Sequence, residues 1–335
     1  MCMGEAMRRR EFITLMGGTA ASWPLAARAQ QLERIRRISV LVPLAADDPE
    51  MQTRLSAFRQ ELQQLGWTDG HNVKIEYRYG ASDPDLSHRH AAELAALAPD
   101  VIFAAGNSAV APLLQAVRSV PIVFAIVPDP VGAGFVDSLA RPGGNATGFV
   151  VFEYGISGKW LELLKEIAPH LTRVAVLRDP ALAAGIGQFA AIQSVAPSMG
   201  VELSAINVRD AAEIGQAIAT FARIPNGGLI VTASGLSVVH RGLIIALALR
   251  HKLPAVYWAS FYTEDGGLAS YGPNATNEYR RAAGYVNRIL KGEKPADLPV
   301  QTPTRYETVI NLKAAKAIGL QIQQTLLVRA DKVIE

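Results

Sequence analysis

The chain of 335 residues is 50% hydrophobic and 19% charged, enough apolar material for a large core, which excludes a disordered or fibrous protein. The formal net charge is +3, of which residues 1–29, with four arginines and two glutamates, account for +2. The nearly neutral remainder argues against a surface for nucleic acids or anionic membranes. Because Cys2 is the only cysteine, disulfides and cysteine-ligated metal sites are excluded.

The first thirty residues have the layout of a secretory signal. Arg8–Arg10 precedes the uncharged segment 12–27, and Ala27-Arg28-Ala29 has the small-x-small pattern of a cleavage site. Arg9-Arg10-Glu11-Phe12-Ile13 also resembles the twin-arginine export motif, which implies translocation in a folded state. We expect a signal peptide of the twin-arginine type over residues 1–29, cleaved near Ala29, and a periplasmic mature chain without membrane insertion. The alternative is a basic terminus followed by a buried apolar helix.

After the signal, apolar runs typical of strands alternate with segments of helical spacing. The run 38–43 predicts a strand, and the apolar spacing between Met51 and Leu65 predicts a helix that Gly66 ends. Residues 73–79 alternate with a period of two, as in a strand with one wet face. Further expected elements are a helix over 86–97, a strand over 100–105, a helix from 108 and a strand over 121–127. This order is typical of βαβ units around a parallel sheet.

The second half of the chain repeats the pattern. Residues 171–177 resemble residues 35–41, and a strand is expected over 201–208. The remaining expected elements are a helix over 211–223 capped by Asp210, a strand over 228–232, a helix over 240–251 and a strand over 254–258. The sequence therefore predicts an α/β protein of two doubly wound, Rossmann-like lobes, in agreement with its length.

Ligands of open α/β sheets bind beyond the carboxyl ends of the strands. This rule selects six segments of the chain, 43–48, 106–108, 127–134, 178–180, 232–236 and 258–265. The candidate ligand-binding residues are Ala45, Asn107, Ser108, Val127, Asp129, Asp179, Ser234, Trp258, Phe261 and Tyr262.

Several of these candidates have a purely structural alternative. The segment 106–108 could hold a carboxylate at a helix N-terminus, but Ser108 could equally be a plain helix cap. Asp129 could face the ligand or cap the next helix. Trp258, Phe261 and Tyr262 could stack on a planar ligand or pack in a core or hinge.

Catalytic motifs are largely missing. Gly143 and Gly148 have P-loop spacing, but Phe149 stands where the lysine belongs, and neither a Gly-x-Ser-x-Gly elbow nor a dinucleotide-binding glycine motif is present. His88 and His90 are expected in a solvated loop, and His240 and His251 on the surface. We therefore expect a binding protein without catalytic residues, metal or cofactor.

Four stretches carry a resemblance to a known family, namely residues 129–148, 159–169, 289–299 and 311–320. Together they resemble the ABC-transporter substrate-binding proteins of the TrpX-like family, over residues 35–335. The resemblance implies a type I periplasmic-binding-protein fold, with two lobes, three crossover strands and a small-molecule ligand in the cleft. It also implies an ABC permease with its ATPase as partner. We expect the receptor to be a monomer.

In that fold the chain crosses between the lobes three times, and we place the crossings near 148–152, 256–260 and 301–305. Lobe 1 is then expected over 35–150 plus 261–300. Lobe 2 is expected over 151–257 plus 306–335.

The ligand is less determined than the fold. The family resemblance implies amino-acid ligands, often aromatic, yet Ala233-Ser234-Gly235 and Trp258-Ala259 stand where carboxylates are expected in the family. An ammonium group buried without a counter-charge is costly, so Asp179, Glu264 or Asp265 would have to replace them. The alternatives are a receptor that feeds a sensor or chemoreceptor and an α/β enzyme with a weakly marked site. A LacI-like regulator needs a helix-turn-helix where the export signal lies.

Overall fold

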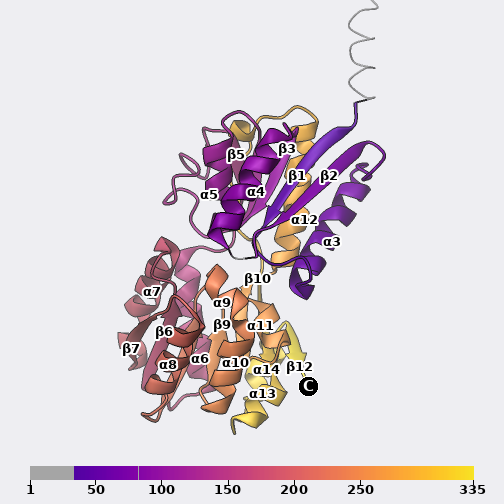
Figure 1. Cartoon of the computed structure of the whole chain (residues 1–335). Coiled ribbons are helices and arrows are strands. Elements are labelled where there is room, and N and C mark those ends of the chain that lie inside the picture. The colour runs from indigo at the N-terminus through magenta and orange to yellow at the C-terminus, as the bar shows by residue number, and fades with distance from the viewer. Residues whose placement is uncertain (1–33, 82) are drawn as a thin grey trace, which may run out of the picture.

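Two β-sheets organise the chain into two lobes in the computed structural model, which describes residues 34–81 and 83–335 (Figure 1). The first sheet has the order β2-β1-β3-β4-β5, and all its strands are parallel. Its strands are β1 (Arg36–Val42), β2 (Val73–Tyr79), β3 (Val101–Ala105), β4 (Ile122–Val127) and β5 (Ala146–Val150).

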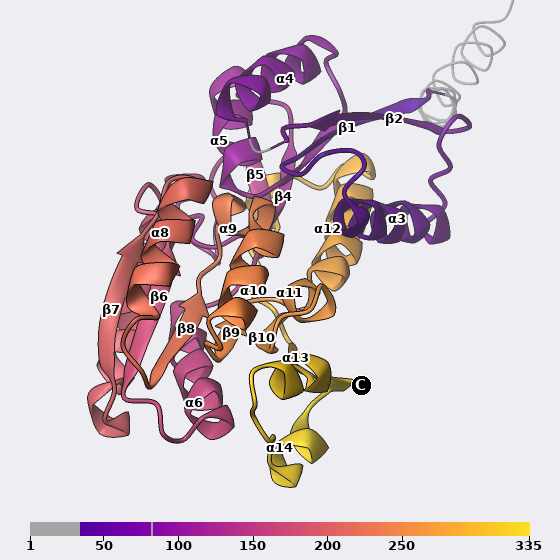
Figure 2. The same cartoon turned by 60° about the horizontal axis from the view of Figure 1, so that its bottom comes forward.

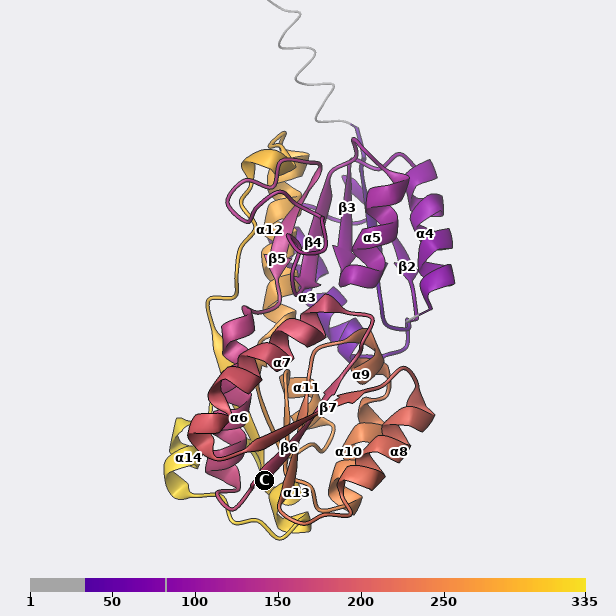
Figure 3. The same cartoon turned by 90° about the vertical axis from the view of Figure 1, so that its left-hand side faces the viewer.

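Helices cover both faces of this first sheet (Figure 3). One face packs against α3 (Pro49–Gln64) and α12 (Ala275–Leu290), which lie side by side, and the other against α4 (Pro84–Ala96) and α5 (Asn107–Ala116). The period of two in β1 explains this sandwich, since Val40 belongs to the α3/α12 core and Leu41 to the α4/α5 core.

The second sheet has the order β12-β11-β10-β9-β8-β6-β7, with only the β10–β11 pair antiparallel. Its strands are β6 (Arg173–Arg178), β7 (Glu202–Asn207), β8 (Gly227–Val231), β9 (Ala255–Tyr257), β10 (Ala269–Pro273), β11 (Tyr306–Asn311) and β12 (Lys332–Ile334). The longer helices here are α6 (Ser157–Ile167), α7 (Ala183–Val195), α8 (Ala211–Phe221) and α10 (Arg241–Arg250).

Short helices complete the second lobe. They are α9 (Gly235–Val239), α11 (Ser260–Glu264), α13 (Leu312–Ala317) and α14 (Gln324–Arg329), with single 3-10 turns at Tyr154–Ile156, Pro197–Met199 and Pro295–Asp297. In Figure 2, α13 and α14 lie at the end of this lobe that faces away from the first. The predicted fold class, two α/β lobes around largely parallel sheets, is confirmed.

The chain passes between the lobes after β5, after β10 and again before β11. Near the last passage Gln301 lies beside β5, where its N–H donates to the Gly148 carbonyl and its own carbonyl accepts from the Val150 N–H. The first and third passages agree with the predicted crossings.

The predicted second crossing at 256–260 is wrong. Instead, α11 connects β9 to β10, and Ala269 and Ser270 pair with Val256 and Tyr257 in the second sheet. Residues 261–273 therefore belong to the second lobe and not, as expected, to lobe 1. The chain returns to the first lobe only where Asn274 caps α12.

The start of α3 matters for the site. Asp48 caps this helix, and its side chain accepts hydrogen bonds from the backbone N–H groups of Glu50 and Met51. The helix ends at Gln64, and Gly66, just beyond the cap Leu65, has a φ of +92° that favours glycine.

The expected signal peptide over residues 1–29 lies outside the described residues. Among the residues that the structure describes, no helix has the length and apolar character needed to cross a membrane.

Candidate functional site

A cavity of about 590 Å³ lies between the two lobes, at the carboxyl ends of their strands. The first lobe lines it with residues that follow β1, β3 and β4, among them Leu44, Asn107 and Pro128. The second lobe lines it with residues that follow β6, β8 and β9, among them Asp179 and Trp258. The position beyond the strand ends is the one predicted from the topology of parallel sheets.

Half of the candidate residues line this cavity. They are Asn107, Ser108, Asp179, Ser234 and Trp258. The others, Ala45, Val127, Asp129, Phe261 and Tyr262, do not line it.

Asn107 and Ser108 lie in the first turn of α5. The helix is capped by Gly106, whose φ of +75° excludes most other residues, so the alternative that Ser108 is the cap is wrong. The Asn107 Oδ1 is buried at the cavity and has no hydrogen-bond partner among the described residues. A buried acceptor without a donor is costly, so this oxygen is free to accept a hydrogen bond from a ligand.

Asp129 has a structural role in place of the expected ligand contact. Its Oδ1 accepts a hydrogen bond of 2.8 Å from the Gly132 N–H, and its Oδ2 accepts one of 3.0 Å from the Tyr154 hydroxyl of the other lobe. Burial and this carboxylate both raise the pKa of Tyr154. Val127 is fully buried in the first lobe, and Ala45 starts the turn before α3 by accepting from the Asp48 N–H.

The three aromatic candidates form a layered cluster in which only Trp258 reaches the cavity. The Trp258 ring lies edge-on to Phe261, with centroids 5.6 Å apart, and Phe261 stacks on Tyr262. The Tyr262 hydroxyl donates to the Ser237 Oγ at 2.9 Å, inside the lobe. Phe261 and Tyr262 therefore support the wall that Trp258 presents.

Ser234 lines the cavity, but its side chain is already engaged. Its Oγ accepts from the Ser237 N–H at 3.0 Å as part of the capping box of α9. The walls around it are mainly apolar and include Leu182, Leu236 and Val238. Ile126 at the end of β4 adds to them from the first lobe, with a φ of +58° that is rare for a β-branched residue.

Arg54 and His240 are among the lining residues that escaped prediction. Arg54 lies between Met51 and Leu55 on the buried face of α3, and only 4% of its surface is exposed. The sequence feature that could have indicated its burial is its position three residues after Met51, which puts it on the apolar face of the helix. His240, expected on the surface, is half-buried and lines the cavity from the junction of α9 and α10.

Of the three carboxylates considered as counter-charges, one faces the cavity. Glu264 pairs with Lys332 at 2.7 Å, and Asp265 pairs with Arg241 at 2.7 Å, both away from the cavity lining. Asp179 lines the cavity, with its Oδ1 accepting from the Ala181 N–H at 2.9 Å. Within residues 34–81 and 83–335, no group of three or more His, Asp, Glu or Cys side chains is arranged to hold a metal ion.

Comparison with known proteins agrees with this architecture. Residues 37–334 match the family described as ABC transporter substrate binding protein. The chain belongs to this family. Membership makes it a small-molecule-binding component of an ABC transporter rather than an enzyme, as predicted from the sequence.

Three relatives illustrate the similarity. The chain is 26% identical to the "Tyrosine-binding protein" of Clostridioides difficile over 281 residues, which cover 82% of this chain and 79% of the relative. A conserved domain protein of Vibrio cholerae has a similar structure, with a TM-score of 0.83, 26% identity and coverage of 90% and 100% of the two chains. The ABC domain of Streptococcus pneumoniae in complex with L-Trp gives a TM-score of 0.83 at 24% identity, with coverage of 89% and 99%.

Proposed function

We propose that this protein is the exported receptor of an ABC importer, which captures a small solute between its lobes and presents the closed form to a permease and its ATPase. The observation that carries this proposal is the cavity lined from both lobes. A solute there contacts both sides only when the lobes are together, so its binding free energy shifts the protein toward the closed form.

The solute class is an amino acid or another small carboxylate with an apolar or aromatic body. Apolar walls and the Trp258 ring suit the body, and Asn107 offers an unpaired polar atom at the end of the cavity that the first lobe forms. Asp179 would supply the counter-charge for an ammonium group. The relative named as a tyrosine-binding protein supports this class.

The remaining features of the proposal concern the location of the receptor. The signal-like residues 1–29 would direct the chain through the twin-arginine route into the periplasm, where the mature protein would act as a monomer.

The two moving bodies would be the two lobes with revised bounds. Lobe 1 would consist of residues 34–150 plus 274–300, and lobe 2 of residues 151–273 plus 306–335.

A thermal-shift screen on mature protein stripped of bound solute tests the function. The panel contains amino acids, aromatic and aliphatic carboxylates, their amides, and sugars. A solute at about 100 times its dissociation constant adds about 2.7 kcal/mol to the free energy of unfolding, which raises the melting temperature visibly. A solute that stabilises the protein and is recovered chemically unchanged supports a receptor. A solute that is consumed, or loss of the permease without effect on its uptake, contradicts the proposal.

A further inference from the structure

Among the described residues of the first lobe, Arg54 is the one charged side chain buried at the cavity. It extends from α3, is 4% exposed and lines the cavity, yet its Nη2 is buried with no hydrogen-bond partner among the described residues. A buried guanidinium N–H without an acceptor is a costly arrangement, and the cost is removed when an anion supplies the acceptor. This orphaned donor therefore points to a ligand.

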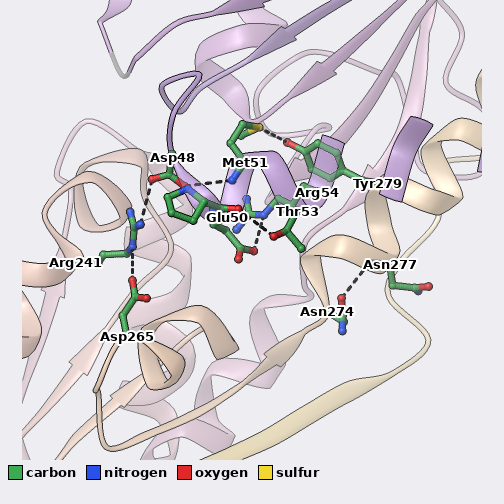
Figure 4. A network of polar contacts seen from close by, with 11 residues as sticks. Asp48, Glu50, Met51, Thr53, Arg54, Arg241, Asp265, Asn274, Asn277 and Tyr279 are labelled. Atoms are coloured by element: carbon green, nitrogen blue, oxygen red, sulfur yellow. Dashed lines mark hydrogen bonds and ion pairs between the residues drawn. The ribbon is translucent and has the colours of Figure 1, made fainter. Parts of the chain in front are cut away.

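The rest of the Arg54 guanidinium is held firmly in place (Figure 4). Its Nε donates to the Glu50 Oε1 at 2.8 Å. Its Cζ lies 5.2 Å from the centroid of the Phe261 ring. The guanidinium also lies beside the Tyr279 hydroxyl. Burial raises the pKa of Tyr279 to about 12, and Arg54 partly opposes this rise. A donor fixed from several sides needs no reordering when a ligand arrives.

We propose that Arg54 binds the carboxylate of the solute through its Nη2, which restricts the solutes of this receptor to carboxylic acids with an apolar body. The planar guanidinium can receive one carboxylate oxygen at Nη2 while its Nε stays on Glu50. This assignment rests on the proposed function. It extends it by naming the residue and the chemical group that select the solute.

The charges around the cavity favour a singly charged anion. Glu50 already offsets part of the Arg54 charge, and Asp179 adds a negative charge to the lining. The other lining arginine, Arg209, is 73% exposed and lies near Glu213, so water screens it. A dianion such as a phosphate would find one buried arginine and two nearby carboxylates, whereas a carboxylate matches the single unpaired donor.

The test compares acids with their own amides by isothermal titration calorimetry. The probe pairs are L-tyrosine and L-tyrosinamide, L-leucine and L-leucinamide, and 3-phenylpropionate and 3-phenylpropionamide. Wild-type protein is expected to bind at least one acid about tenfold or more tightly than its amide. Arg54→Gln is expected to weaken binding of that acid about tenfold or more and to change the affinity for the amide less than threefold.

Two further variants separate ligand binding from folding. Arg59→Gln removes a charge from the exposed face of the same helix and is expected to leave the acid-to-amide ratio unchanged. Glu50→Gln removes the carboxylate that competes for Arg54 and is expected to tighten binding of the acid several-fold. If Arg54→Gln does not fold, the acid-to-amide affinity ratio of wild-type protein and the affinity of Glu50→Gln for the acid still test the role of Arg54.

The proposal is overturned if the amide binds wild-type protein as tightly as the acid, if folded Arg54→Gln keeps wild-type affinity for the acid, or if no carboxylate in the panel binds. A neutral solute that binds and is released unchanged would keep the receptor function and reject only the role of Arg54. A solute that is consumed would reject the proposed function itself.

Discussion

Arg241 and Asp48 form an ion pair across the boundary between the lobes, with Nη2 and Oδ2 3.1 Å apart (Figure 4). Asp48 belongs to the first lobe, where it caps α3, and Arg241 opens α10 in the second. Burial alone lowers the pKa of Arg241, but Asp265 and Asp48 together outweigh it and raise the pKa, so Arg241 stays charged. The pair therefore joins the helix that carries Arg54 to the opposite wall of the cavity.

Breaking this pair is expected to open the ligand-free protein. Asp48→Asn removes the charge that faces Arg241, while Asn still caps α3. The Arg241 and Asp48 side chains are only 17% and 15% exposed. Even about 1 kcal/mol, the upper end for solvent-exposed pairs, is enough to change the closed fraction severalfold. Small-angle X-ray scattering of ligand-free protein should show a larger radius of gyration for this variant. Asp265→Asn is the control, since it removes only the Arg241 partner in the same lobe, and an equal expansion in both variants would contradict the prediction.

Trp258 is expected to report on the ligand directly. It is 3% exposed, so Trp258→Ala also costs folding stability, about 3 kcal/mol for a large aromatic side chain, but it should weaken solute binding by still more. Trp258→Phe keeps most of the packing on Phe261 and is expected to remove most of the ligand-induced change in tryptophan fluorescence.

Matched variants at the other described tryptophans provide the control. Trp67, half-buried in the first lobe, donates to the Asn287 Oδ1, and Trp160, buried in the second, donates to the Tyr271 carbonyl. Neither tryptophan lines the cavity. Trp67→Phe and Trp160→Phe should keep the fluorescence response to the solute. Unchanged affinity and response in folded Trp258→Phe would show that Trp258 is not a contact.

The sequence predicts the place of the site better than its polar contacts. The rule that ligands lie beyond the ends of parallel strands selected Asn107, Asp179 and Trp258, because each directly follows a strand or opens the next helix. Arg54 follows no strand. Arg54 was not selected from the sequence, because a charged residue on a helix is normally expected to face solvent. In the folded chain, packing against Phe261 and Glu50 buries it.

Tertiary contacts also decide where the chain makes its second crossing between the lobes. Five residues of α11 turn Phe261 and Tyr262 into the core and return the chain to the second sheet as β10. So short a helix carries no periodic signal, and β10 ends in glycine and proline, which are rare inside strands. Pairing with β9 and β11, which only the folded chain reveals, decides where residues 260–273 belong.

Export by the twin-arginine route is tested at the motif itself. Arg9→Lys combined with Arg10→Lys keeps both positive charges but removes the arginine pair that this route reads. The double variant is expected to leave the precursor in the cytoplasm, measured by cell fractionation and by the mass of the chain. Arg8→Lys is the matched control and should be exported and cleaved as before. Normal export of the double variant would favour the general secretory route.

Two glutamates are expected to give opposite dependences of stability on pH. Glu278 is 2% exposed, and burial raises its pKa against the opposing effect of Arg281, 2.9 Å away. A carboxyl group with a raised pKa contributes stability below its unfolded value, about 4.3, and this contribution is lost as the pH rises through the folded value. The free energy of unfolding of wild type relative to Glu278→Gln should therefore fall between about pH 4 and pH 7.

Glu293, in the same lobe, is expected to give the opposite dependence of stability on pH. Its hydrogen bond from Arg288 lowers its pKa, so the stability it contributes is present at neutral pH and lost on acidification. Urea unfolding of wild type, Glu278→Gln and Glu293→Gln at about pH 4 and about pH 7 measures how the free energy of unfolding of each variant differs from that of wild type. Glu293→Gln should lose stability relative to wild type as the pH rises, and Glu278→Gln should gain it. The same slope in both variants would mean that burial does not control the titration of Glu278.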